Sequence, residues 1–339
     1  MLKYLPIISL SFVLLTLTGC SSDDEEGPAW FPQTATHSSC MALQGNVRHV
    51  EVYNEELEMT EVKADFDASG RCIAWDATGV PEEETTPSKA KSMGSGWLST
   101  PARYHYTYNE KGQLVSVVRQ PLGGEAEHFT ITYGKHHLWL PLPFPIASLA
   151  PYMVQGIESI TSEHYHLVCD GVEAHAEQRI LAWMSLRETT DFVFENQKAV
   201  EQHARLYSTA ADGSETQIQR TRTFFEYGAR QLQRTLEVTV DDEGNQEKTE
   251  VVFSPQRPYQ LLQKRFYTGM EMTPLYETGY QYDEAGRLIS VEDASGDGFF
   301  EMPYTQAYRS FDRMGNWSSA LKTYSEEESY HLSQQIVYW

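Results

Sequence analysis

A short turn motif recurs along this chain and constrains its fold more than any other feature of the sequence. The motif is an apolar residue, Asp or Asn, any two residues, Gly, and then a polar residue. Its Asp or Asn and its Gly stand at Asp67 and Gly70, Asn109 and Gly112, Asp241 and Gly244, Asp283 and Gly286, and Asp312 and Gly315. Asp and Asn side chains open turns by accepting a hydrogen bond from the backbone two residues on, and Gly adopts the left-handed conformation at the turn exit. The motif therefore predicts five hairpin turns.

The segments on both sides of these turns alternate with the period of a β-strand. Residues 104–108 read Tyr-His-Tyr-Thr-Tyr before one turn, and residues 280–282 read Tyr-Gln-Tyr before another. Aromatic and β-branched residues at every second position are typical of strands with one buried face. We therefore expect an all-β fold, a large antiparallel sheet of repeated hairpins that is open or curled into a barrel-like or sandwich shape.

The best copy of the unit consists of Tyr282, Asp283, Gly286, Arg287 and Leu288. It resembles the YD repeat of RHS-type proteins, and the chain is similar to short surface lipoproteins of the Bacteroidetes that carry such units in domains of unknown function. The resemblance implies strand–turn–strand units stacked edge to edge. It does not imply the toxin-wrapping role of large RHS proteins, because this chain has few repeats and no toxin domain.

The N-terminus has the pattern of an exported, lipid-anchored protein. Lys3 is followed by an apolar run over residues 5–17, which is short for a membrane span and has the length of a signal-peptide core. Leu-Thr-Gly-Cys20 resembles a bacterial lipoprotein processing box, so we expect residues 1–19 to be a signal peptide and Cys20 to carry the lipid. The alternative is a plain secretory signal with an incidental Cys.

An acidic run, Asp-Asp-Glu-Glu at 23–26, follows the Cys. Four adjacent carboxylates repel one another and stay hydrated, so residues 20–38 are predicted to be a flexible tether to an all-β domain at 39–339. The run also resembles the export tract of Bacteroidetes surface lipoproteins. We therefore expect an outer-membrane protein that is exposed at the cell surface, with a periplasm-facing protein as the alternative.

The formal net charge of −22 excludes nucleic acid as a partner, because such a surface repels phosphates. The chain has no Gly-x-Ser-x-Gly, His-Glu-x-x-His or phosphate-binding loop, so no catalytic residue is predicted and a hydrolase is the least favoured function. The favoured function is a non-enzymatic binding or scaffold role, with the membrane as a partner through the lipid on Cys20. The alternative is a glycan-binding accessory lipoprotein of a nutrient-uptake system.

An apolar segment at 136–156 interrupts the repeats and contains four prolines. Proline excludes a regular helix or a central strand there. We expect a buried plug, or a crossover between halves at 39–135 and 157–339. The alternative is a partner-contact loop that presents Trp139 and Phe144.

Two tryptophans on predicted loops are the candidate ligand-binding aromatics. They are Trp97, in the polar stretch 79–101, and Trp139. Aromatic faces stack on sugars, although most of the aromatic residues in this chain are expected to fill the core and the cross-strand pairs.

One stretch resembles the start of a calcium loop. Asp293, Ser295, Asp297, Phe299 and Glu301 have the spacing of the first ligands, but the bidentate Glu required at the twelfth position is replaced by Tyr. A simple acidic turn is the favoured interpretation and a weak calcium site the alternative. No other cofactor is expected, because the histidines have no zinc-site spacing.

The three cysteines after Cys20 allow at most one disulfide within the chain. These are Cys40, Cys72 and Cys169, and three cysteines cannot all pair within one chain. An exported protein can form disulfides, so a bond between Cys40 and Cys72 is permitted. Residues 176–210 have helical propensity, but their alternation and the surrounding repeats favour strands.

Overall fold

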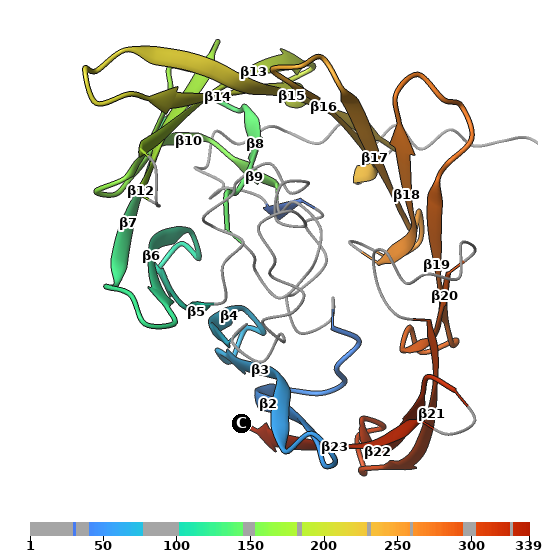
Figure 1. The fold of residues 1–339 in the computed structure, drawn as a ribbon. Coiled ribbons are helices and arrows are strands. Elements are labelled where there is room, and N and C mark those ends of the chain that lie inside the picture. The colour runs from blue at the N-terminus through green and yellow to red at the C-terminus, as the bar shows by residue number, and fades with distance from the viewer. Residues whose placement is uncertain are drawn as a thin grey trace, which may run out of the picture.

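The fold, described here from a computed structural model, is a closed barrel of antiparallel strands (Figure 1). The structure describes residues 30–31, 41–76, 102–144, 153–181, 185–228, 232–257, 260–293, 303–325 and 328–339. Twenty of its strands, β2–β7 and β10–β23, follow one another around the ring, and β23 pairs with β2 to close it. The prediction of an all-β antiparallel sheet curled into a barrel is confirmed.

The strands of the ring have the following bounds. The first part of the ring contains β2 (Val47–Asn54), β3 (Met59–Phe66), β4 (Cys72–Asp76), β5 (Ala102–Tyr108), β6 (Leu114–Pro121), β7 (Glu127–Tyr133), β10 (Ile157–Thr161), β11 (Tyr165–Cys169), β12 (Ala174–Leu181) and β13 (Ser185–Glu195). The second part contains β14 (Lys198–Thr209), β15 (Glu215–Tyr227), β16 (Leu232–Asp241), β17 (Gln246–Phe253), β18 (Leu261–Thr268), β19 (Tyr276–Tyr282), β20 (Leu288–Asp293), β21 (Tyr304–Phe311), β22 (Trp317–Thr323) and β23 (Ser329–Tyr338). The region at 176–210 therefore forms strands, as the alternation favours.

Three short strands lie inside the ring. β8 (Trp139–Pro141) pairs with β9 (Met153–Gln155), and β9 pairs with β1 (Trp30–Phe31). β8 meets the wall through one parallel pairing with β14 (Figure 1). Leu140 and Phe144 are buried, and the Phe144 ring packs edge-on against Phe129 of β7 at 5.2 Å between ring centroids. The described part of the proline-rich segment therefore lies inside the barrel and packs against its inner wall, as expected of a buried plug.

The two faces of the wall differ in chemistry because the side chains alternate along each strand. On β7, Phe129 and Ile131 are buried, whereas His128 and Thr130 are exposed. Because Phe129 contacts the segment inside the ring, the buried set faces inward and the exposed set forms the outer wall. The inward residues of most strands belong to one continuous hydrophobic core.

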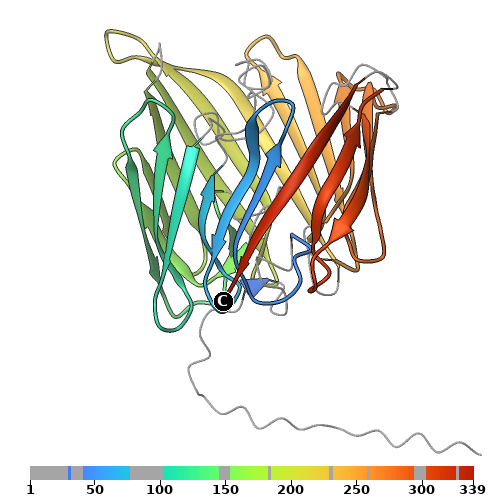
Figure 2. The ribbon, with the colours of Figure 1, turned by 90° about the horizontal axis from the view of Figure 1, so that it is seen from below.

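The five motif turns are distributed unequally between the two rims of the barrel. Each has its Gly at positive φ, and the Gly amide donates a hydrogen bond to the carbonyl oxygen of the Asp or Asn three residues earlier. The strands run alternately up and down (Figure 2). Four turns, at 67–71, 109–113, 283–287 and 312–316, share the rim where the chain ends at Trp339, which we call the C-terminal rim. The turn at 241–245 lies at the opposite rim.

Neighbouring units on the C-terminal rim are joined by a repeated tyrosine contact. The hydroxyl groups of Tyr108, Tyr133 and Tyr308 donate to the carbonyl oxygens of Cys72, Leu114 and Leu288, at 2.8, 2.9 and 2.7 Å. Each acceptor stands two residues after the Gly of the preceding turn. Each of these tyrosines therefore links its own strand to the motif turn that precedes that strand in the chain.

The predicted disulfide concerns Cys72, whose thiol is buried and donates a hydrogen bond to the carbonyl oxygen of Ala74 (3.2 Å). Burial raises the pKa of this thiol well above its usual range. The expected partner, Cys40, lies outside the described residues. The sheet is continuous between residues 39–135 and 157–339, because β7 pairs with β10.

Candidate functional site

The outer wall carries an ion-pair network that crosses five neighbouring strands. It consists of Glu226, Arg234, Glu250, Arg265 and Glu277, one from each strand from β15 to β19. Arg265 bridges two carboxylates, with Nη1 3.1 Å from Glu250 Oε2 and Nε 3.0 Å from Glu277 Oε2. Glu250 also binds Arg234 and accepts a hydrogen bond from the Tyr267 hydroxyl.

A second group of ion pairs continues the network on the neighbouring strands. Asp191 of β13 accepts from His175 Nδ1 at 2.7 Å and from Arg205 Nη1 at 2.8 Å. Arg187 forms a bidentate ion pair with Glu215, in which Nε donates to Oε1 at 2.8 Å and Nη2 donates to Oε2 at 2.6 Å. Mutually paired charges therefore occur on the outer face of the strands from β12 to β19.

The inner face of the same arc adds polar groups to the apolar core. Thr221 and Thr239 share a hydrogen bond of 3.1 Å, and Thr190 and Thr235 are buried on this face. Burial raises the pKa of the half-buried Glu188 to about 8, which a hydrogen bond from Thr190 only partly opposes.

Glu237 lies on the same inner face, on β16. Burial raises the pKa of its carboxyl group to about 8, and the negative charge of Glu188 adds to this rise. The arc from β12 to β19 thus has hydrogen-bonding groups on its inner face and ion pairs on its outer face, and the inner strand β8 reaches this arc through its pairing with β14.

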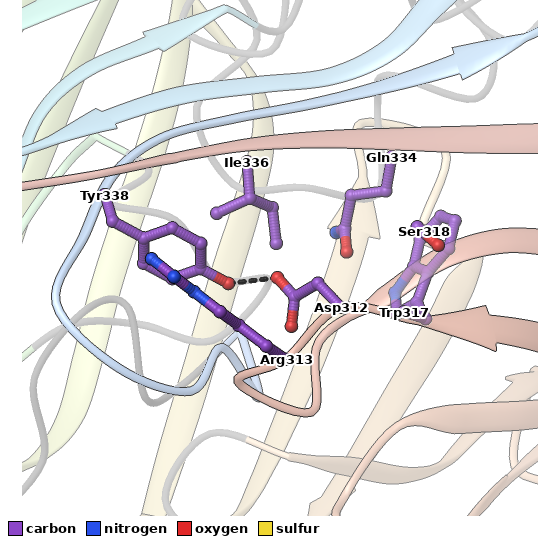
Figure 3. A pocket seen from close by; sticks show the side chains of 7 residues that line it. All are labelled: Asp312, Arg313, Trp317, Ser318, Gln334, Ile336 and Tyr338. Atoms are coloured by element: carbon purple, nitrogen blue, oxygen red, sulfur yellow. Dashed lines mark hydrogen bonds between the residues drawn. The ribbon is translucent and has the colours of Figure 1, made fainter.

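A hollow of about 510 Å³ lies where β22 and β23 meet the C-terminal rim (Figure 3). It is lined by Asp312, Arg313, Trp317, Ser318, Gln334, Ile336 and Tyr338. In Figure 3, Gln334 and Ile336 extend from β23 toward the turn that carries Asp312, and Trp317 stands beside them. The volume is in the range of small-molecule sites, about 300–1,000 Å³.

Gln334 is the unusual residue of this hollow. The residue is 9% exposed, and its Oε1 atom is buried without a hydrogen-bond partner. Gln334 pairs with Val52 across the strand boundary, and its inward neighbours Leu332 and Ile336 are apolar. A buried amide oxygen with no partner is destabilising by about 1–3 kcal/mol, so its position next to a hollow points to a ligand.

The floor of the hollow is a fixed hydrogen-bond network. Tyr338 donates its hydroxyl proton to Asp312 Oδ2, and Asp312 Oδ1 accepts from the backbone amides of Met314 (2.8 Å) and Asn316 (3.0 Å). Burial opposes ionisation of Asp312, but these hydrogen bonds outweigh it and hold the pKa of the carboxyl below its usual range. Asp312 is therefore a carboxylate, and its turn geometry is fixed before any ligand arrives.

The sequence-predicted site residues do not come together in the hollow. Trp139 lies inside the barrel on β8, where it packs against Met153 and Ala199. Asp293 ends β20. The remaining predicted site residues, Cys20, Trp97, Ser295, Asp297, Phe299 and Glu301, lie outside the described ranges. Among the residues that are described, no group of three His, Cys, Asp or Glu residues could hold a metal ion.

Two residues of the hollow could have been found from the sequence. Trp317 directly follows the motif turn at 312–316, so it begins the outgoing strand of a predicted hairpin. Gln334 stands between Leu332 and Ile336 at every second position of the last strand, where the alternation calls for an apolar residue.

Comparison with known proteins leaves the chain without a family. No family model matches it, and neither does any curated protein. The RHS and YD-repeat resemblance therefore receives no support. No helix among the described residues has the length and apolar character needed to cross a membrane.

Two solved structures resemble the fold loosely. One is a porin-like protein from Bacteroides vulgatus ATCC 8482, with a TM-score of 0.35 and 9% identity, covering 87% of this chain and 99% of that chain. The other is a porin-like protein from Bacteroides uniformis ATCC 8492, with a TM-score of 0.29 and 10% identity over the same shares. A likeness this small does not decide what this chain does.

Proposed function

We propose that this chain is a lipid-anchored protein of the outer membrane, exposed at the cell surface, with a non-enzymatic binding or scaffold role. In this proposal the barrel stands in water beside the membrane. The lipid on Cys20 and the tether at 20–38 attach it. The observation that carries the placement of the barrel in water is the network from Glu226 to Glu277 on the outer wall. The lipid anchor rests on the sequence around Cys20.

The energetics of a lipid-facing barrel support this placement. Barrels that span a bilayer carry an apolar band about 25 Å tall on the outside, and a Lys or Arg facing lipid near the midplane is destabilising by about 2–4 kcal/mol. Arg234, Arg265 and Glu250 lie on the outer face of the middle strands of the arc. A wall of this chemistry is stable in water and unstable in hydrocarbon.

The attachment is tested by removing the lipid site while keeping export. Residues 1–20 are replaced by a cleavable secretory signal that leaves no Cys, and Ser21→Ala in the native chain serves as the matched control. We expect the unlipidated protein in the soluble periplasmic fraction and the Ser21→Ala protein in the outer membrane. Recovery of the folded, unlipidated barrel from the outer membrane would show that the strands themselves enter the bilayer.

Surface exposure is tested separately on intact cells. Protease added outside should cleave the wild-type protein, because the tether and barrel lie beyond the outer leaflet. Protection in intact cells, with cleavage after the outer membrane is opened, would favour the periplasm-facing alternative.

A second candidate function, a glycan-binding accessory protein of a nutrient-uptake system, is favoured by one observation. The hollow combines an aromatic ring with polar side chains that converge on the same space. Sugar-binding sites need both groups, one for the ring face and one for the hydroxyl groups.

A further inference from the structure

We infer that the hollow beside β22 and β23 binds a neutral carbohydrate, with Gln334 Oε1 accepting a hydrogen bond from a ligand hydroxyl group. The inference deepens the binding role proposed above and rests on it, but it does not depend on the lipid anchor. The observation that carries it is the buried amide oxygen, which has no partner in the protein and lines a hollow large enough for a small ligand.

The ligand must offer a hydrogen-bond donor at Gln334. Oε1 of an amide only accepts, so a carboxylate or phosphate at this position would be repelled rather than bound. A hydroxyl group supplies the missing proton and keeps a second lone pair for neighbouring polar atoms. Ser318 also lines the hollow, and its hydroxyl group can accept a hydrogen bond from the ligand, whereas the Tyr338 hydroxyl is already bonded to Asp312 and Asn316.

The ligand must also offer an apolar face. Trp317 is half-buried, and the indole packs against Tyr308 at 5.4 Å between ring centroids. This contact fixes the orientation of the ring, so little side-chain freedom remains to be lost on binding. A sugar ring has C–H groups on its faces and hydroxyl groups at its edge, which matches an indole beside an amide and the Ser318 hydroxyl group.

The charges of the hollow favour a neutral ligand. Asp312 and Arg313 contribute one negative and one positive charge, which cancel at a distance. The chain as a whole carries a formal net charge of −22 and therefore repels anions that approach it. A neutral sugar enters without this penalty.

The experiment measures sugar binding to the full chain purified in detergent. The probes are glucose, galactose, mannose and N-acetylglucosamine, with glucuronate as the anionic comparison, observed by saturation-transfer NMR and tryptophan fluorescence. We expect at least one neutral sugar to bind. Gln334→Leu should weaken that binding about tenfold, because one ligand hydrogen bond is lost.

The matched control is Gln335→Leu, the same change on the exposed outer face of the same strand. It should bind as the wild type does. Gln334→Leu should also melt at the same or a higher temperature than the wild type, because a leucine suits the apolar neighbours better than an unpaired amide. A structural role for Gln334 would instead lower the melting temperature.

Three outcomes overturn the inference. The first is that no neutral sugar binds to the wild type at millimolar concentration. The second is that Gln334→Leu binds as tightly as Gln335→Leu. The third is that glucuronate binds more tightly than every neutral sugar. None of these outcomes affects the lipid anchor or the placement of the barrel, which the fractionation experiment tests.

Discussion

Gln44 and Asn316, 272 positions apart in the chain, exchange two hydrogen bonds. The Gln44 amide donates to Asn316 Oδ1 at 2.7 Å, and Asn316 Nδ2 donates to the Gln44 carbonyl oxygen at 2.8 Å. Asn316 Nδ2 also lies 2.7 Å from the Tyr338 hydroxyl oxygen. One buried amide thus joins the segment before the first ring strand to the last motif turn and the last strand. The closure of the barrel depends on this contact as well as on the pairing of β2 with β23.

Asn316→Ala is therefore expected to lower the free energy of unfolding by about 2 kcal/mol, since it removes the three hydrogen bonds of a side chain that is itself buried. The matched control is Asn245→Ala. Asn245 occupies the same position after the turn Gly, but it lies at the opposite rim and its bond to Asp241 is exposed. Urea denaturation of both variants measures the difference. Equal losses of stability would show that the contact contributes nothing to closure.

The turns could be predicted from the sequence because their causes are local. Asp283 and Gly286 form a turn independently of the rest of the chain. The alternation of side chains before and after this turn predicts its two strands. The closure could not be predicted in the same way, because the contact between Gln44 and Asn316 depends on the position of a residue at the other end of the chain. The hollow depends on the same closure, since Gln334 and Asp312 approach only when the last strands are in register.

A second prediction concerns the backbone of the best motif copy. Gly286 has φ +87°, and a Cβ atom there would overlap Arg257 Nη1. Gly315 has φ +88°, and a Cβ atom there would meet nothing within 4 Å. Both changes to Ala introduce left-handed strain of about 1–2 kcal/mol. Gly286→Ala must in addition displace the Arg257 guanidinium from the carbonyl oxygens of Glu284 and Ala285.

We therefore expect Gly286→Ala to be the more destabilising of the two, by about 1 kcal/mol, in thermal or urea unfolding. The double variant Arg257→Ala/Gly286→Ala should lose this difference, because no side chain then occupies the space. If Gly286→Ala and Gly315→Ala unfold alike, the guanidinium does not hold the turn.

A third prediction concerns the pH dependence of stability. Burial raises the pKa of Glu188 to about 8 in the folded protein, from an ordinary value of 4.5. Between these two values the folded state holds a proton that the unfolded state has released, so stability falls as the pH rises from about 4.5 to about 8. Glu188→Gln removes this loss, since glutamine has no proton to release.

The variant should therefore melt at a higher temperature than the wild type at pH 8.5 and at nearly the same temperature at pH 4.5. The gain is about 1 kcal/mol, well below the limit set by the shift, because water reaches part of the side chain. Glu173→Gln, on an exposed turn, is the control and should change neither value. A Glu188→Gln gain that does not depend on pH would show that the carboxyl group is not the cause.

The last prediction concerns the outer wall, where Glu250 is the centre of the ion-pair network. Its side chain is 8% exposed and contacts Arg234, Arg265 and the Tyr267 hydroxyl. Burial opposes the charge of Glu250, but the hydrogen bonds from Arg265 and Arg234 outweigh it and hold the pKa of the carboxyl below its usual range. Because the folded pKa is lowered, this stability is present at neutral pH and is lost as the pH falls through the folded pKa.

Glu250→Gln should lower the free energy of unfolding at pH 7 by about 2 kcal/mol, because it leaves two guanidinium groups beside each other without their shared carboxylate. Glu226→Gln, at the exposed end of the same network, should have a much smaller effect, since water screens that pair. At a pH below the folded pKa, the wild type and Glu250→Gln should unfold alike. If the Glu250→Gln protein is as stable as the wild type at pH 7, the outer wall does not gain stability from its ion pairs in water, and the main support for placing the barrel outside the bilayer is removed.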